Sequence, residues 1–351
     1  MEVLNINNQK VQFTKLLQRY LEQKAAMVGL GWWGRHMVNS VEKSEKIEVN
    51  RLTARRPDRH KDFSDEKGIP LVADYQALLQ DPEVDAVILC TPHSQHEDQV
   101  LAAVEHGKQI FCEKPLSLSK ASIEKMLAAT NKAGIVMGVG HERRYESTFE
   151  AISKIVKSGE LGTQMHVEAN FSHSIFTTVE ADNWRGSQEE APAAGMTGMG
   201  VHLTDLFISM FGPVESVVAQ SARRVLPLPT GDVVTVQIRF ESGATGFVGA
   251  ISATPYYGRF TVFGNEMWVE ARDDAHPQEG GRTHLITCGK DGVQHSQTFE
   301  PKDPVRANIE EWVDAVEGHG AYRFTDEQRI GNVAVLEAIA KSVSTGDWVD
   351  V

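Results

Sequence analysis

The chain has 351 residues, of which 41% are apolar and 24% charged, as in ordinary globular proteins too long for one hydrophobic core. The net charge of −13 argues against nucleic acid or an anionic membrane surface as the main partner. No stretch approaches the ~20 apolar residues of a membrane span, and the first 24 residues lack the apolar run of a secretory signal. We therefore expect a cytoplasmic protein.

Residues 1–23 are predicted to form an amphipathic arm ahead of the first strand. Their apolar residues recur at helical spacing, at Phe13, Leu16, Leu17, Tyr20 and Leu21. We expect this arm to dock on the body of the protein or on a partner subunit.

Residues 24–144 alternate short apolar runs with helical stretches. The predicted strands are 25–28, 47–53, 84–90, 110–112 and 135–139, and the predicted helices are 34–42, 75–79, 96–105 and 120–133. Strands separated by helices at this spacing imply right-handed crossovers. The segment is therefore predicted to be a Rossmann domain, α/β with a doubly wound parallel sheet.

The pattern changes in residues 145–351. Residues 233–240 alternate with a period of two, Ser242-Gly243 breaks the run, and 245–251 continues as its hairpin partner. Further strands are predicted at 260–263, 268–269 and 284–286, and a helix over 336–344 is expected to dock back on the body. This half is predicted to be an α+β domain with a large, mostly antiparallel open sheet.

A glycine-rich turn, Gly29-x-Gly31-x-x-Gly34, follows the first predicted strand and opens a predicted helix, which is the context of a dinucleotide-binding turn. The first two glycines allow close approach of a pyrophosphate, and the third lets the helix pack on the strand. Trp32 and Trp33 within this loop are expected mainly to pack, with Trp32 as a wall of the cofactor cleft.

The end of the second predicted strand selects between NAD and NADP. An acid about 20 residues beyond the glycines would bond the ribose 2′-hydroxyl. Ala54 stands there instead, followed by Arg55 and Arg56, whose guanidinium groups suit a 2′-phosphate. We expect NADP, with NAD as the alternative if the arginines are solvated, stack on adenine, or if Asp58 folds back to the ribose.

Glu113-Lys114-Pro115 follows a short buried-type strand that Pro115 terminates. Taken alone, this tripeptide predicts an exposed charged turn, although the cis isomer of a Lys-Pro bond costs little. The upstream nucleotide turn favours another interpretation, in which Lys114 projects its amine into the crevice at the end of the sheet.

The order of these motifs resembles that of the glucose-fructose oxidoreductase / inositol dehydrogenase (Gfo/Idh/MocA) family. The matching motifs are Gly29 to Gly34, Thr91-Pro92-His93-x-x-His96, Glu113-Lys114-Pro115 and Gly200-Val201-His202-x-x-Asp205. The resemblance implies reversible hydride transfer between a nicotinamide and a hydroxyl carbon of a sugar, inositol or related polyol. It also implies a homo-oligomer, a dimer or tetramer, assembled through the sheet of the second domain.

The same resemblance implies site residues. Lys114 would lie beside the nicotinamide and bond the reacting hydroxyl, and His202 would exchange its proton. The cofactor-binding residues would be Thr91, Pro92, His96, Glu113 and Lys114, in addition to the glycine turn and the arginines. His93-x-x-His96 lacks further ligands at metal spacing, so no metal is expected.

Candidate substrate residues lie around the predicted domain junction. Arg143 or Arg144 would border the cleft or form a structural salt bridge. Asn170 belongs to a polar row, alternating with apolar residues, that would line a carbohydrate site or face solvent. Trp184 could stack on a sugar ring beside Arg185, and Thr197 adjoins the histidine motif.

One position departs from the family pattern. Many active members carry an aspartate four residues before the histidine, where this chain has Gly198. Either His202 acts alone, or Thr197, Asp205 or His173 compensates, or the glycines admit a bulkier substrate. The alternatives to a sugar or polyol dehydrogenase are therefore a cofactor-binding sensor with little turnover and a dehydrogenase of a cyclic or aromatic-attached alcohol.

Overall fold

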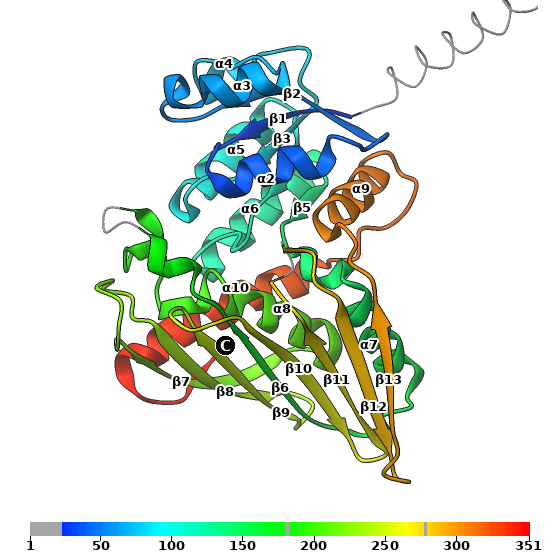
Figure 1. The fold of residues 1–351 in the computed structure, drawn as a ribbon. Coiled ribbons are helices and arrows are strands. Elements are labelled where there is room, and N and C mark those ends of the chain that lie inside the picture. Colours follow the sequence, from blue (N-terminus) through cyan, green and yellow to red (C-terminus); the bar gives the residue numbers. More distant parts are fainter. Residues whose placement is uncertain (1–22, 180–182, 277–278) are drawn as a thin grey trace, which may run out of the picture.

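A computed structural model describes residues 23–179, 183–276 and 279–351. The predicted N-terminal arm falls on residues that lie outside this part, apart from Gln23, which begins the first strand. Figure 1 shows two layered units, one around each of two sheets. No helix within the described ranges is both long and apolar enough to cross a membrane.

The first sheet has five parallel strands in the order β2-β1-β3-β4-β5, which confirms the predicted doubly wound sheet. Its strands are β1 (Gln23–Val28), β2 (Ile47–Thr53), β3 (Ala86–Leu89), β4 (Gln109–Cys112) and β5 (Met137–Val139). Its helices are α2 (Trp32–Val41), α3 (Lys61–Lys67), α4 (Tyr75–Leu79), α5 (His96–Glu105) and α6 (Lys120–Ala133). Of these helices only α3 was not predicted.

The central strand β3 is apolar on both faces because each face packs into a core. Val87 and Leu89 lie in one core, and Ala86 and Ile88 lie in the other. The alternation along β3 thus places successive side chains on opposite faces.

A helix from the end of the chain completes the second of these cores. Trp312 of α9 (Pro304–Val316) is fully buried, packs edge-on against Phe111 of β4 with ring centroids 5.6 Å apart, and donates to the Val136 carbonyl at 3.0 Å. A Cβ at Gly138 would lie 2.9 Å from its indole ring, so that strand position has room only for glycine. This packing was not predicted.

The second sheet has nine strands in the order β13-β12-β11-β10-β6-β9-β8-β7-β14, and only the β6–β9 pair is parallel. The strands are β6 (Gln164–Ser172), β7 (Val214–Ala222), β8 (Val233–Phe240), β9 (Thr245–Ile251), β10 (Tyr257–Gly264), β11 (Met267–Asp273), β12 (Thr283–Gly289), β13 (Gln294–Phe299) and β14 (Val349–Asp350). The predicted mostly antiparallel open sheet is confirmed.

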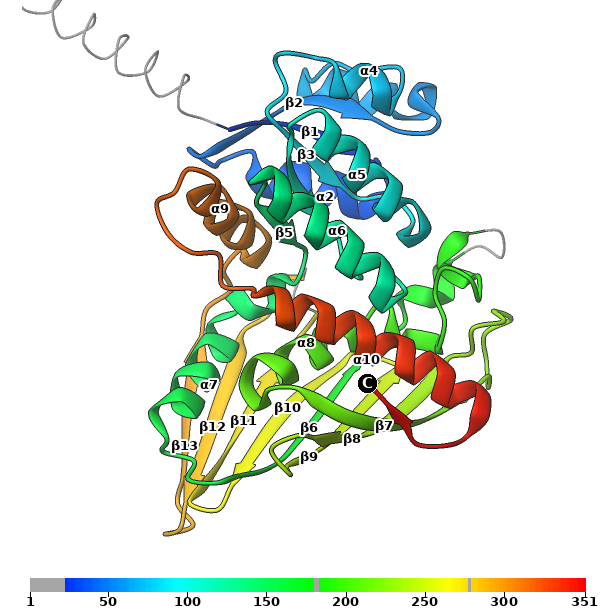
Figure 2. The ribbon, with the colours of Figure 1, turned by 180° about the vertical axis from the view of Figure 1, so that it is seen from behind.

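Three helices cover one face of the nine-stranded sheet: α7 (Ser147–Ser158), α8 (Gly200–Phe211) and α10 (Asp326–Thr345) (Figure 2). Between them and the sheet lies one apolar core, to which Val167, Ala169 and Phe171 of β6 contribute. The opposite face carries no helix from the described part of the chain (Figure 1).

Candidate active site

The glycine-rich turn has the backbone geometry that its sequence requires. Gly29 has φ +98°, and a Cβ there would lie 2.5 Å from the Cys90 carbonyl oxygen. A Cβ at Gly34 would collide with the Gly29 carbonyl, whereas a Cβ at Gly31 would meet nothing within 4 Å. The turn is therefore tight on its protein side and open at Gly31, where a pyrophosphate could approach.

The N-terminus of α2 is free to bind an anion. Its N-cap, Gly31, makes no side-chain cap, and its first turn has no acidic residue. The unpaired N–H groups and the positive end of the helix dipole are therefore available to phosphate. These features fit a dinucleotide.

The end of β2 lies beside this turn, because the Gly29 N–H donates to the Thr53 carbonyl at 2.9 Å. Ala54 is half-buried, while Arg55 and Arg56 are exposed. Within the described ranges, neither arginine side chain forms an ion pair or hydrogen bond. Two unpaired guanidinium groups therefore stand next to the loop where the adenosine end of a dinucleotide would bind.

A cavity of about 1070 Å³, including the solvent at its mouth, opens where the two units meet. Many of the predicted site residues line it: Trp32, Trp33, Thr91, Glu113, Lys114, Arg143, Trp184, Arg185, Thr197 and His202. The cavity thus brings the nucleotide loop, the Glu-Lys-Pro turn and the histidine helix together.

Lys114 lies at the centre of this arrangement, just beyond β4, and the Lys114-Pro115 bond is cis. Its Nζ donates to the carbonyl oxygen of Gly198 at 3.1 Å. Burial lowers the pKa of the amine, and the carboxyl groups of Glu113 and Glu142 oppose that shift. The expectation of an amine directed into the crevice agrees with this position.

Glu113 is only 6% exposed, and its carboxyl group lies against Gly140, where a Cβ would collide with it. Its Oε2 accepts the backbone N–H of Lys114 at 3.2 Å. Burial raises the pKa of Glu113, and the neighbouring Lys114 opposes that rise. Glu113 is therefore a buried residue that holds the backbone of Lys114 in place through this hydrogen bond.

His202 lies in the first turn of α8 and is 4% exposed. Its Nε2 lies 3.9 Å from Oε1 of Glu142, and its Nδ1 has no hydrogen-bond partner within the described residues. Burial, and then the nearby Lys114, hold the pKa of His202 well below its usual value. The imidazole is therefore neutral at pH 7 and able to accept a proton.

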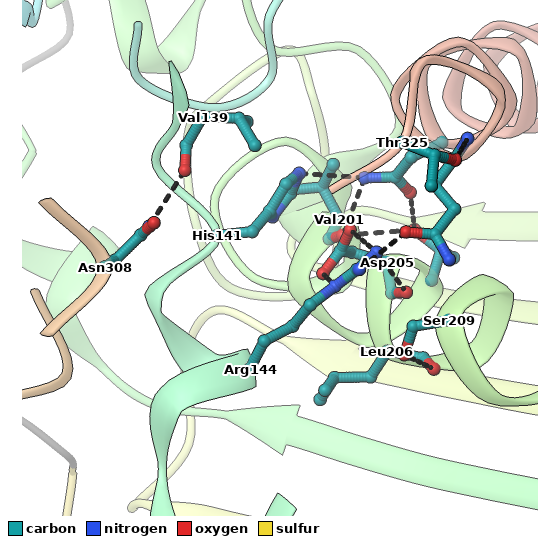
Figure 3. A network of polar contacts seen from close by, with 12 residues as sticks. Val139, His141, Arg144, Val201, Asp205, Leu206, Ser209, Asn308 and Thr325 are labelled. Atoms are coloured by element: carbon teal, nitrogen blue, oxygen red, sulfur yellow. Dashed lines mark hydrogen bonds and ion pairs between the residues drawn. The ribbon is translucent and has the colours of Figure 1, made fainter. Parts of the chain in front are cut away.

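The helix that carries His202 is fixed by buried polar contacts (Figure 3). Arg144 binds Asp205 through two hydrogen bonds, of 2.7 and 2.6 Å, to its two carboxylate oxygens. Asn332 of α10 donates to the Val201 carbonyl and contacts His141. Asp205 is thus already paired, so it does not compensate for Gly198, and Arg144 is a structural salt bridge rather than a cavity residue.

Gly198 is packed against an aromatic ring. A Cβ at this position would lie 2.7 Å from Cζ of Phe176, in the 3₁₀ segment Ile175–Thr178, and both residues line the cavity. The space that a side chain at position 198 would occupy is therefore filled by a ring from another segment. The neighbouring Thr197 is buried and faces the same cavity.

The part of the cavity around Trp184 is aromatic and basic. The Arg185 guanidinium stacks on Trp184 at 4.2 Å, and His93 meets Trp184 edge-on with centroids 4.9 Å apart. Arg143 lines the cavity and also pairs with Glu146 and Asp273.

Several predicted residues lie outside the cavity. Pro92 and His96 are not among its lining residues. His96 contacts the carbonyls of Thr91, Pro115 and Leu116, which joins two loops at the ends of β3 and β4. Asn170 is on the helix-free face, because its strand neighbours Ala169 and Phe171 point into the core. The structure therefore does not bring Asn170 to the site.

Other lining residues were not predicted as site residues, chiefly Cys90, His93, Glu142, Phe171, Phe176 and His276. His173, considered only as a replacement for the missing aspartate, also lines the cavity. A signal existed for Glu142, since it comes soon after a predicted parallel strand, at the carboxyl edge where ligands bind.

A Rossmann domain with an anion-binding turn, joined across a lysine- and histidine-lined cavity to an α+β domain, defines an NAD(P)-binding oxidoreductase. Residues 23–141 match the family model of oxidoreductases with an NAD-binding Rossmann fold, and residues 149–270 match the GFO/IDH/MocA C-terminal domain. The chain belongs to the Gfo/Idh/MocA family.

Individual relatives span most of the chain. It is 27% identical to 1,5-anhydro-D-fructose reductase of Ensifer adhaerens, over 93% of this chain and 97% of that protein. It is 30% identical to an uncharacterised oxidoreductase of Bacillus subtilis, over 72% and 74%. A solved structure of a candidate NADPH-dependent oxidoreductase from Desulfitobacterium hafniense is similar with a TM-score of 0.85 and 25% identity, over 94% and 97%.

Proposed function

We propose that this protein is an NADP-preferring dehydrogenase or reductase that acts on a hydroxyl or ketone carbon of a sugar-like or polyol substrate. The observation that carries the proposal is the meeting of Lys114 and His202 in one cavity that begins at the nucleotide turn. The sugar reductase among the relatives supports the substrate class.

Lys114 would bind and polarise the reacting oxygen. An ammonium group has three N–H donors, of which the Gly198 carbonyl takes one. The others remain for the substrate oxygen, and the positive charge would stabilise the alkoxide that develops as hydride leaves.

His202 would exchange the hydroxyl proton. Its neutral imidazole suits a base in alcohol oxidation. When bound, the nicotinamide supplies the hydride acceptor or donor, and the chain's own residues bind the oxygen and move the proton.

The preference for NADP rests on Arg55 and Arg56, exposed and unpaired among the described residues at the end of β2. We expect the double variant Arg55→Ser/Arg56→Ser to weaken NADPH binding by at least about tenfold, since charge-assisted hydrogen bonds contribute about 1.5–3 kcal/mol each. NADH binding should change little. Arg223→Ser, an exposed arginine on the second domain, is the control.

A screen of sugars and polyols with both dinucleotides, followed at the nicotinamide absorbance band, tests the activity itself. Tight cofactor binding without turnover across a broad panel would instead favour a cofactor-binding sensor. Product analysis of any active alcohol would separate a sugar or polyol from a cyclic or aromatic-attached substrate. The aromatic side chains of Trp184 and Phe176 in the cavity wall would favour the second kind of substrate.

We also propose a homo-oligomer formed through the helix-free face of the nine-stranded sheet. Phe247 of β9 and Tyr257 of β10 expose 36% and 47% of their surface there. An exposed sheet face with large apolar side chains suits burial against a second copy. Analytical ultracentrifugation of wild type and Phe247→Lys tests it, with a monomeric wild type as the contradicting result.

A further inference from the structure

Glu142 is a cavity residue to which the proposed chemistry has so far given no role. It opens the 3₁₀ segment Glu142–Tyr145 that follows β5, and its side chain lines the cavity with Lys114 and His202. Its Oε1 lies 3.9 Å from Nε2 of His202. Its other oxygen, Oε2, is buried without a hydrogen-bond partner in the described part of the chain. A carboxyl group with an unused oxygen thus faces the histidine at the reaction site.

His202 is poorly suited to keep a proton. Burial and the Lys114 ammonium lower its pKa, and His141, Arg143 and His276 add to the effect. An imidazolium formed next to these groups is therefore destabilised. A proton taken up from a substrate hydroxyl would need a second acceptor close by.

Glu142 has the properties of that acceptor. Burial, and then the carboxyl group of Glu113, raise the pKa of Glu142 to about 7, while Lys114 and Arg143 oppose the rise. Glu146 lies near enough for its own pKa to be affected by Glu142. A carboxyl group poised near neutrality can both accept and release a proton at pH 7.

The other buried carboxyl groups near the histidine are already used. Asp205 accepts two hydrogen bonds from Arg144. Glu113 lies against Gly140 and accepts the Lys114 backbone N–H. Among the described residues, Glu142 is the carboxylate that lies within 4.0 Å of the His202 ring.

We propose that Glu142 accepts the proton that His202 removes from the substrate hydroxyl, so that it takes the place of the carboxylate missing at Gly198. This inference rests on the proposed function. In alcohol oxidation the carbon–hydrogen bond breaks and its electron pair leaves as hydride to the oxidised nicotinamide dinucleotide. As the carbonyl forms, the oxygen–hydrogen bond breaks and the hydroxyl proton binds Nδ1 of His202, while the proton on Nε2 passes to Oε1 of Glu142. Solvent then takes up that proton from the carboxyl group. Glu142 thus acts on the substrate only through His202.

The test compares wild type with Glu142→Gln, which keeps the shape but cannot accept a proton, and with Glu142→Asp, which keeps the acid. We expect Glu142→Gln to lower kcat for alcohol oxidation about 100-fold with KM and NADP affinity unchanged, and Glu142→Asp to recover part of it. The rise of wild-type kcat with pH near neutrality should disappear in Glu142→Gln. Glu311→Gln, a half-buried carboxylate on α9 outside the cavity, is the control and should keep wild-type kcat.

A second readout needs no substrate. Acidification of the wild type from pH 9 to pH 5 should produce an infrared carbonyl band of a protonated buried carboxylic acid that Glu142→Gln lacks. Wild-type kcat and pH profile in Glu142→Gln would overturn the proposed proton transfer to Glu142 but not the proposed function. Loss of cofactor binding in Glu142→Gln, or failure of Glu142→Asp to recover any turnover, would also overturn it. No turnover by the wild type on the whole panel would overturn the proposed function, and with it the proton transfer to Glu142.

Discussion

The side-chain nitrogen of Lys114 donates a hydrogen bond to the backbone carbonyl of Gly198 at 3.1 Å. This contact joins the turn after β4, in the parallel-sheet domain, to the loop that leads into α8 of the second domain. It therefore fixes the amine beside the helix that carries His202. The contact is made to a backbone atom, so any residue at position 198 could make it, and the importance of glycine there must come from space.

Lys114→Ala removes the group that we expect to stabilise the developing alkoxide. Loss of such electrostatic stabilisation lowers kcat by about 100- to 1,000-fold. The cofactor affinity should stay within a few fold, because the phosphate-binding turn is separate from this side chain. Steady-state kinetics and a fluorescence titration with NADPH measure the two quantities. Lys125→Ala, on the exposed face of α6, is the control, and full turnover by Lys114→Ala would contradict the role.

Gly198→Ala tests whether space at this position matters. The new Cβ would lie 2.7 Å from the Phe176 ring, so either the ring or the loop must move. Overpacking of this kind lowers the free energy of unfolding by about 1–3 kcal/mol, and here it should also weaken substrate binding. We expect a raised KM in Gly198→Ala and recovery in Gly198→Ala/Phe176→Ala. An equal KM for wild type and the single variant would show that the Phe176 ring or the loop at position 198 moves without affecting substrate binding.

The local signals in the sequence were sufficient for most regular elements of the first domain, although not for α3. The predicted limits of α6 agree with the structure because Ser119 caps its start and Gly134, in the left-handed conformation, ends it. Likewise, the position of Lys114 and His202 on the cavity could be predicted because each belongs to a motif with fixed spacing.

Long-range packing carried no comparable signal. The burial of Trp312 against Phe111 joins residues 201 positions apart, and nothing in either segment alone indicates it. Phe176 over Gly198 comes from a short 3₁₀ segment without periodicity. The position of Glu142 after β5 indicated the edge of the sheet but not the contact with His202. Asn170 shows the converse, since its alternation correctly predicted a polar face, while only the tertiary fold decides that this face points away from the cavity.

Asp205→Asn should destabilise the protein strongly. Arg144 and Asp205 are both buried, and removal of one charge leaves the other without its partner. Breaking a buried pair in this way costs about 3–5 kcal/mol. Urea unfolding gives the value. Asp65→Asn, which removes the exposed Lys61–Asp65 pair, should cost less than about 1 kcal/mol. Similar losses in the two variants would mean that the buried pair does not hold α8 in place.

Acid should weaken the fold through His141. Burial lowers the pKa of this histidine to about 4, and its Nε2 contacts Asn332 at 3.0 Å. The unfolded chain has the ordinary pKa near 6.5, so between pH 6.5 and pH 4 it binds more protons than the folded protein. The stabilisation is therefore complete above about pH 6.5 and is lost as the pH falls toward 4, by about 3 kcal/mol for a shift of this size.

Urea unfolding at pH 7.5, 6 and 5 measures the slope of stability with pH. His173, whose pKa burial also lowers to about 4, contributes to this slope in the same direction. His141→Gln should be less stable at pH 7.5 but show a shallower fall, whereas His319→Gln on the surface should keep the wild-type slope. An unchanged slope in His141→Gln would show that protonation of His141 is not the cause of the acid destabilisation.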